Sequence, residues 1–238
     1  MRKFLVALAL VALVPATSVW ATPMVHVGSF TGGSVYITSP AGTLNSSGGW
    51  TTAGPSPLTF SGFTGGDVWI NGMTLEGFCV DLQHYVSPPA DYSALPLGAM
   101  SAWNIYSGAS ATAGQQAAWL YNTYANTGGV DNAGLQLAIW EVLYDTDHNL
   151  GTGNFTGHDG GPAGQTYLDA LSAHTGPLGD AIWVELTNYT SSDGQPYGQD
   201  FIVNYTAPPP NVPEPGSMLL LGTGLFGLAG AVRRRMRK

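Results

Sequence analysis

The chain has no lysine or arginine between residues 22 and 212. Its 7 basic residues lie at positions 2–3 and 233–238, whereas all of its 15 acidic residues except Glu214 lie between residues 22 and 212. Nucleic-acid binding depends on lysine and arginine contacts to phosphates. The composition of the central region therefore excludes nucleic acid as a partner, and its excess of acidic residues favours solubility.

The first 21 residues predict a secretory signal peptide. Arg2 and Lys3 precede an apolar run from Phe4 to Val14, and small residues lead to Ala21. This order is typical of a segment that the Sec translocon recognises and a signal peptidase removes. We expect cleavage after Ala21 and export of the chain.

The last residues have three parts: Pro213-Glu214-Pro215, an apolar run from Met218 to Val232, and a basic end at 233–238. The apolar run is just long enough to cross a bilayer, and the basic end would stay in the cytoplasm. The pattern resembles the PEP-CTERM sorting signal of Gram-negative bacteria. The resemblance implies an exosortase as partner, a precursor anchored in the inner membrane by one transmembrane helix, and a product at the cell surface or outside the cell. The alternative is an ordinary C-terminal anchor.

Cysteine occurs once, as Cys79 in the segment Phe78-Cys79-Val80-Asp81. An exported protein with one cysteine cannot form an internal disulfide with it, so the thiol is buried and inert, paired with another chain, or used in chemistry. Composition alone favours an inert thiol in the core.

A second motif, Leu135-Gln136-Leu137-Ala138-Ile139-Trp140, has the form apolar-Gln-x-x-apolar-Trp. Together with Phe78-Cys79, it resembles the thioester domains of bacterial surface proteins. That resemblance implies a bond between the Cys79 sulfur and the Gln136 side-chain carbonyl, formed with loss of ammonia. Phe78, Leu135, Ile139 and Trp140 match the supporting positions of the motif.

The spacing of apolar residues predicts that Gln136 lies on a helix. Asp131 or Asn132 can cap it, and one apolar stripe faces a core: Leu135, Ala138, Ile139, Val142 and Leu143. Gln136 flanks this stripe, and Trp140 follows one turn later. We expect the Trp140 indole to shield a thioester from water.

These patterns lead to a non-enzymatic hypothesis. The exported protein would use a Cys79–Gln136 thioester once, to attach covalently to an amine or hydroxyl on a surface partner. The missing lysines fit this hypothesis, because they remove amines that would consume the thioester. If Gln136 is not the acyl donor, Gln116 is the first substitute.

Two alternatives remain. The protein could be a structural or carbohydrate-binding component of an exopolysaccharide or biofilm matrix, with Cys79 buried. It could also be a cysteine hydrolase that uses His84, His148, His158 or His174 as base. His84 is five positions from Cys79 on an expected strand, which places the two on opposite faces.

No cofactor or metal is expected. Asp145, Asp147 and Asn149 are spaced like the start of a calcium loop, but Leu150 occupies the glycine position and no later Glu closes the loop. A polar loop is the better interpretation.

The predicted fold class is α+β: an antiparallel sheet or small barrel with an insertion of about three helices, at 22–206. The helices are expected at 113–124, 135–144 and 164–173. Early strands are expected at 25–38 and 58–63, and late strands at 181–188 and 200–205. Asn71-Gly72 predicts a hairpin between strands 68–70 and 73–75, which leads to Cys79. A proline-rich linker at 207–212 then precedes the sorting signal at 213–238.

Overall fold

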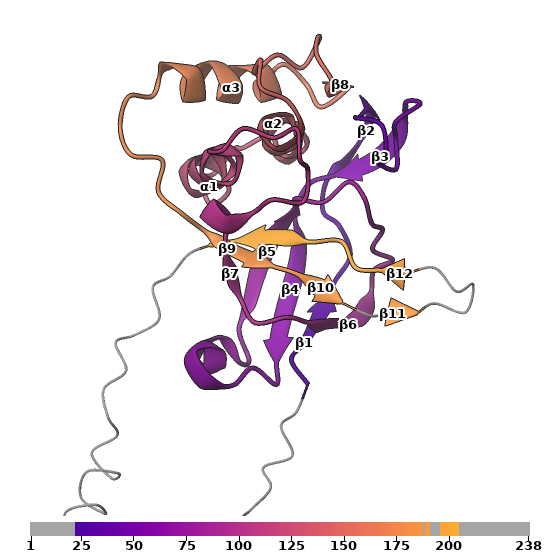
Figure 1. Ribbon diagram of the computed structural model, residues 1–238, viewed down its shortest axis with the longest axis vertical. Helices are drawn as coiled ribbons and strands as arrows, with labels where there is room; N and C mark the ends of the chain where they lie inside the picture. Colours follow the sequence, from indigo (N-terminus) through magenta and orange to yellow (C-terminus); the bar gives the residue numbers. More distant parts are fainter. Residues whose placement is uncertain (1–21, 188, 191–195, 205–238) are drawn as a thin grey trace, which may run out of the picture.

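A curled antiparallel sheet forms the lower layer of the protein, and three α-helices cover one end of it (Figure 1). The computed structural model describes residues 22–187, 189–190 and 196–204. The mixed fold with an antiparallel sheet and a helical insertion is confirmed. The signal peptide, the linker and the C-terminal apolar run lie outside the described residues. Within the described part of the chain, no helix has the length and apolar character needed to cross a membrane.

The main sheet has eight strands in the order β10-β6-β1-β4-β5-β13-β9-β7. They are β1 (Met24–Val27), β4 (Ser56–Ser61), β5 (Thr74–Cys79), β6 (Ala90–Ala94), β7 (Gly98–Ala99), β9 (Ile182–Val184), β10 (Leu186–Thr187) and β13 (Phe201–Val203). Alternate residues of β1 and β4 are buried, as the period of two requires.

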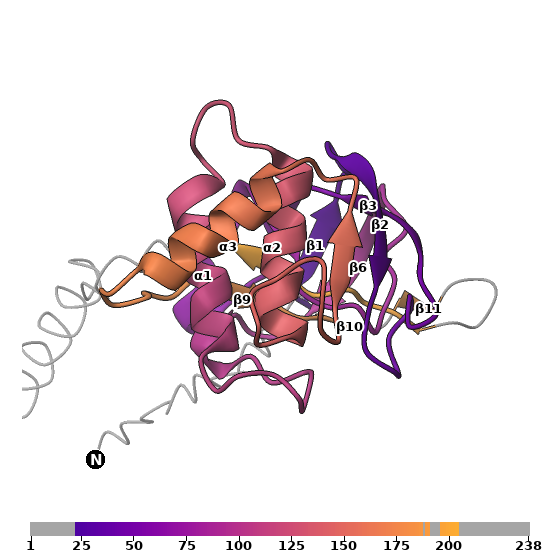
Figure 2. The same ribbon diagram turned by 90° about the horizontal axis from the view of Figure 1, so that it is seen from above.

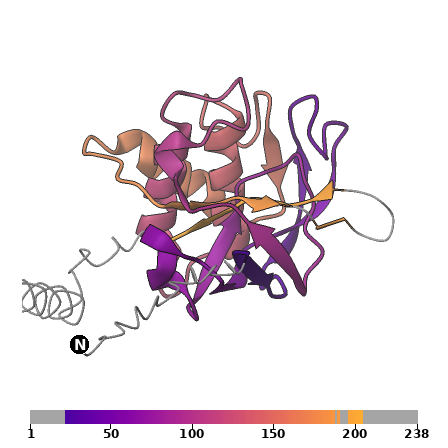
Figure 3. The ribbon, with the colours of Figure 1, turned by 60° about the horizontal axis from the view of Figure 1, so that its bottom comes forward.

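The sheet curls because strands that are adjacent in sequence belong to its two opposite ends. Only Glu185 separates β9 from β10, and β6 and β7 are also close in sequence. β6 pairs with β10 and β7 pairs with β9, at opposite ends of the strand order. The curved sheet, seen from below in Figure 3, brings apolar side chains from all its strands except β7 into one core.

A second sheet and a small hairpin flank the first. Strands β2 (Gly33–Thr38), β3 (Gly49–Ala53) and β8 (Thr156–His158) form an antiparallel sheet in the order β3-β2-β8. Strands β11 (Tyr189–Thr190) and β12 (Pro196–Tyr197) pair with each other. The three-stranded sheet lies beside the helices (Figure 2).

The helices are α1 (Ala113–Tyr124), α2 (Asn132–Tyr144) and α3 (Ala163–Ala173), which confirms the three predicted helices. The Asp131 side chain caps α2 by accepting a hydrogen bond from the Gly134 N–H at 3.0 Å. α2 packs against α1, α3, β2 and β3, and every residue from Gly134 to Tyr144 is buried. The prediction of one apolar stripe facing a core therefore describes only part of the buried surface of α2, because neighbouring elements cover this helix on all sides.

The predicted hairpin at Asn71-Gly72 is wrong in its first strand. Residues Gly65–Ile70 form a 3₁₀ helix, η1, at the end of the sheet away from the α-helices (Figure 1). The Asn71 side chain bonds both the N–H and the carbonyl of Phe63, which fixes this turn locally. The strand that pairs with β5 is β4 instead. A second 3₁₀ helix, η2 (Met100–Ala102), packs under α1.

Candidate functional site

Cys79 is the last residue of β5, at a place where one neighbouring strand has ended. β13 pairs with it on one side, through Phe201, while β4 pairs only with residues 74–77 of β5. The hydrogen bond from Val80 N to Asp200 O makes Cys79 and Phe201 a non-hydrogen-bonded pair. The N–H and carbonyl of Cys79 therefore point away from β13, toward the space that β4 leaves.

The carboxamide of Gln136 occupies that space. Its Oε1 accepts a hydrogen bond from Cys79 N at 3.0 Å, and its Nε2 donates to Cys79 O at 2.7 Å. Gln136 is completely buried and Cys79 is 2% exposed. The fold thus brings together the two residues of the predicted pair, which are 57 positions apart.

The sulfur of Cys79 faces a different glutamine. Cys79 Sγ donates to Gln199 Oε1 at 3.0 Å, and Gln199 Nε2 donates to the carbonyl of Asp81 at 2.8 Å. Burial, with a further contribution from Asp81, raises the pKa of the Cys79 thiol well above its usual value. The thiol is therefore neutral and shielded. Sequence reasoning missed Gln199, because no motif marks it and it lies 120 positions from Cys79.

Asp81 and His84 form a pair beside the cysteine. His84 Nδ1 lies 2.5 Å from Asp81 Oδ2, and Gln83 N donates to Asp81 Oδ1 at 2.6 Å. Burial raises the pKa of Asp81, although these hydrogen bonds and His84 oppose the shift.

Among the described residues, no histidine bonds to Cys79. The side chains of the other three candidate bases of the hydrolase alternative bond elsewhere: His148 to Ser172, His158 to Asp159, and His174 to the carbonyl of Pro177.

Tyr144, on the same helix as Gln136, contacts the segment that follows Cys79. Tyr144 Oη accepts a hydrogen bond from Leu82 N at 2.8 Å, and its ring packs against Trp103 and Tyr106. Trp140 is buried, and its ring contact is with Phe155 at 6.4 Å. The Phe78 ring packs edge-on against Tyr121, and the side chains of Leu135 and Ile139 are in the core.

A hollow of about 330 Å³ lies next to this site. Gln199, the partner of the thiol, lines it together with Leu82 and the half-exposed Tyr85. Its remaining wall includes hydroxyl and amide side chains: Asn45, Thr51, Thr52 and Ser87. Gln199 therefore contacts both the hollow and the buried sulfur.

Gln116, the substitute acyl donor, is on α1 and only partly buried. None of its side-chain hydrogen bonds within the described residues involves Cys79. The structure therefore brings Gln136 and Gln199 to the cysteine, and not Gln116.

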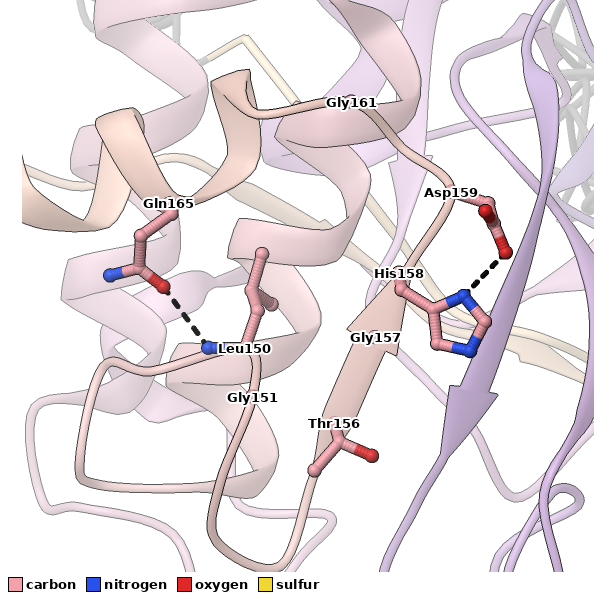
Figure 4. A pocket seen from close by; sticks show the side chains of 8 residues that line it. All are labelled: Leu150, Gly151, Thr156, Gly157, His158, Asp159, Gly161 and Gln165. Atoms are coloured by element: carbon pink, nitrogen blue, oxygen red, sulfur yellow. Dashed lines mark hydrogen bonds and ion pairs between the residues drawn. The ribbon is translucent and has the colours of Figure 1, made fainter.

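A second hollow, of about 670 Å³, lies between β8, α3 and the loop after α2. Figure 4 shows His158 and Asp159 on one side of it, and Gln165 reaching the backbone of Leu150 on the other. The His158 ring also stacks on Tyr36, at 5.0 Å between centroids, and lies edge-on to Trp50, which is 63% exposed. Tyr36, Trp50 and His158 form an exposed aromatic patch.

A family model for the PEP-CTERM protein-sorting motif matches residues 211–235. These residues include Pro213, Glu214 and Pro215. The chain carries a PEP-CTERM sorting signal. No curated protein and no solved structure matches the chain.

The PEP-CTERM motif implies an exported protein that an exosortase processes and that is anchored in the membrane before processing. This confirms the predicted sorting class and the exosortase partner. The PEP-CTERM match covers the C-terminal signal alone, so it says nothing about the chemistry of Cys79 and Gln136. Cleavage after Ala21 stays a prediction.

Proposed function

We propose that this exosortase-processed protein uses an internal thioester between Cys79 and Gln136 for single-use covalent attachment. The observation that carries the proposal is the pair of reciprocal hydrogen bonds that hold the Gln136 carboxamide against Cys79 in a site closed to solvent. Two reactive partners held in one place need little further ordering to react.

Thioester formation is balanced without an outside reagent. The Cys79 sulfur attacks the Gln136 side-chain carbonyl carbon, the carbon–nitrogen bond breaks, and the thiol proton leaves with the amide nitrogen as ammonia. The sulfur faces Gln199 Oε1, so it must leave that oxygen before it attacks Gln136. In the attachment step, a target amine or hydroxyl attacks the same carbon, and the Cys79 thiol is released.

The surroundings support such a bond. Water hydrolyses an exposed thioester, and burial of both residues excludes water. The described chain has no lysine whose amine would consume the acyl group. Gln199 separates the thiol from the neighbouring hollow, so a movement of Gln199 would open a route for a target. The hollow has hydroxyl, amide and apolar side chains in its lining, a mixture that suits a polysaccharide.

Methylamine treatment tests the proposal. A thioester conceals Cys79 from a thiol reagent in the denatured, untreated protein, and methylamine releases the thiol while labelling Gln136. Cys79→Ala should abolish labelling, and Gln116→Ala should leave it unchanged. Label on Gln199 would move the acyl donor to that residue. A thiol that titrates fully on denaturation alone, with no label anywhere, would refute the thioester.

A second candidate is non-covalent binding of matrix polysaccharide by the aromatic patch. Exposed aromatic rings pack against sugar faces, and Trp50 is among the most exposed large apolar side chains of the described chain. Trp50→Ala should weaken retention on exopolysaccharide, whereas Tyr85→Ala, at the other hollow, should not. Equal retention of both variants and the wild type would reject this candidate.

A further inference from the structure

Three carboxylates meet at the C-terminal end of α2. Glu141 belongs to the last turn of the helix, Asp145 follows it, and Asp147 lies in the next loop. One oxygen from each lies within 4.8 Å of the others. One Ca²⁺ ion holds its oxygen ligands at 2.3–2.6 Å, so ligand oxygens lie at most about 5 Å apart. The spacing is therefore that of ligands around one ion.

The buried side chain of Glu141 places one carboxylate oxygen in this cluster without a hydrogen-bond donor. Its side chain is 0% exposed, and its Oε1 accepts a hydrogen bond from Asn149 N at 2.9 Å. Its Oε2 is buried, and no N–H or O–H group of the described residues donates to it. When Glu141 holds a proton, a side-chain hydrogen bond to Asp147 adds to burial in raising the pKa of Glu141. An unpaired buried carboxylate oxygen costs free energy unless a proton or a cation satisfies it. Asp145 is 6% exposed, so the inner part of the cluster is closed to water.

No lysine or arginine of the described chain neutralises the negative charge of these three carboxylates. Residues 22–204 contain no lysine or arginine. The neighbouring His148 bonds Ser172 through Nδ1, and burial lowers its pKa, although Asp147 opposes that shift. The C-terminal end of a helix also carries partial negative charge, which favours a cation and disfavours carboxylates.

We propose that Glu141, Asp145 and Asp147 bind a divalent cation, with calcium as the preferred ion. An all-oxygen ligand set rich in carboxylates suits calcium or magnesium rather than zinc or copper. The loop also supplies exposed positions for water ligands, because Asp147 faces solvent. The sequence pattern failed to indicate this site because the closing glutamate comes before the aspartates, from α2, and not after them.

A cation at this site would link α2, the helix that carries Gln136, to the loop that follows α2. Asp145 Oδ2 already accepts hydrogen bonds from the backbone of Asn154 and Phe155. The Phe155 ring packs on Trp140, which is one turn from Gln136 on α2. A cation on Asp145 and Glu141 would therefore stabilise the end of α2 against its neighbours.

Calcium chloride titration of the purified, processed protein, freed of metal with EDTA, tests the proposal. We expect saturable binding of one Ca²⁺ per chain by calorimetry, with a Kd of about 10⁻⁵–10⁻³ M, and a higher unfolding temperature with calcium. Glu141→Gln should fold, since its amide resembles a protonated carboxyl, and should weaken binding at least about tenfold. Glu76→Gln, at an exposed glutamate on β5, is the matched control and should bind as the wild type does.

Asp147→Asn gives a second readout that does not depend on the core, because Asp147 is exposed. It should also weaken calcium binding while the EDTA-treated protein unfolds close to the wild-type temperature. Absence of binding heat and of any unfolding shift in the wild type would overturn the proposal. So would calcium affinities of Glu141→Gln and Asp147→Asn equal to that of the wild type. A stronger response to magnesium chloride than to calcium chloride would overturn the choice of ion.

Discussion

At the scale of single residues, buried polar groups shape the site around Cys79. Gln136, Gln199 and Tyr144 each satisfy backbone groups of residues 79–82, at the place where β4 no longer pairs with β5. An unsatisfied buried donor or acceptor costs about 1–3 kcal/mol. The same contacts that keep the cysteine segment in place also bring the Gln136 carboxamide to the cysteine.

The buried carboxyl group of Asp200 makes the free energy of unfolding depend on pH. Burial, reinforced by Asp81 and Glu185, raises the pKa of Asp200 from 3.8 to about 8, despite hydrogen bonds from Trp183 and Leu186. The folded state holds a proton that the unfolded state releases near pH 4. The stabilisation is therefore fully present below about pH 4, falls as the pH rises, and is gone above about pH 8.

We expect the free energy of unfolding, measured with urea in EDTA, to fall by about 2–4 kcal/mol between pH 5 and pH 8. Asp200→Asn should reduce this slope, and Glu76→Gln, at an exposed position with no histidine beside it, should not change it. Slope that remains in Asp200→Asn comes from Glu141, whose pKa burial and a hydrogen bond to Asp147 raise to about 8, and from Asp81, whose pKa burial also raises. A wild-type stability that rises over this range would contradict the protonated Asp200.

At the scale of elements, α1 is seated on η2 by a close backbone contact. A Cβ atom on Gly114 would lie 1.7 Å from the carbonyl oxygen of Met100. Neither group is a flexible side chain, so α1 or η2 would have to move. Only glycine allows this approach.

Gly114→Ala should therefore destabilise the fold by about 2–3 kcal/mol, although alanine favours helix formation. Chemical unfolding of the variant measures the change. Gly128→Ala, in the loop after α1 with nothing within 4 Å of its Cβ, is the control and should change stability little. Unchanged stability in Gly114→Ala would mean that α1 does not pack on η2 in this way.

The elements also show which features a sequence can predict. The helices follow from local signals, such as the Asp131 cap and the apolar spacing of α2, and their predicted ranges agree with the structure to within three residues. The strand predicted at 68–70 failed because Asn71 bonds to Phe63, a contact that no periodicity encodes. Gln199 and Tyr144 joined the cysteine site only through sheet pairing and helix packing, so motifs could not find them.

At the scale of the whole molecule, the absence of lysine from residues 22–204 protects the proposed thioester, and this protection can be tested. A lysine near the thioester should capture the acyl group as an internal amide. Ser87 lines the hollow beside Gln199 and offers a position for such a lysine.

Ser87→Lys should keep the mass lost as ammonia but expose one thiol on denaturation, and it should take up no methylamine. Gly128→Lys, on the helix loop, should behave as the wild type. Tandem mass spectrometry would locate the amide link between the introduced lysine and Gln136. If Ser87→Lys takes up methylamine normally, the absence of lysine has no protective role at this position.

The most direct measurement is the intact mass of the untreated, processed protein beside that of Cys79→Ala. We expect the wild type to be lighter than its sequence by one ammonia and the variant to have its full sequence mass. A wild type at full sequence mass would contradict the thioester and leave Cys79 and Gln136 as a buried structural pair in an exported PEP-CTERM protein.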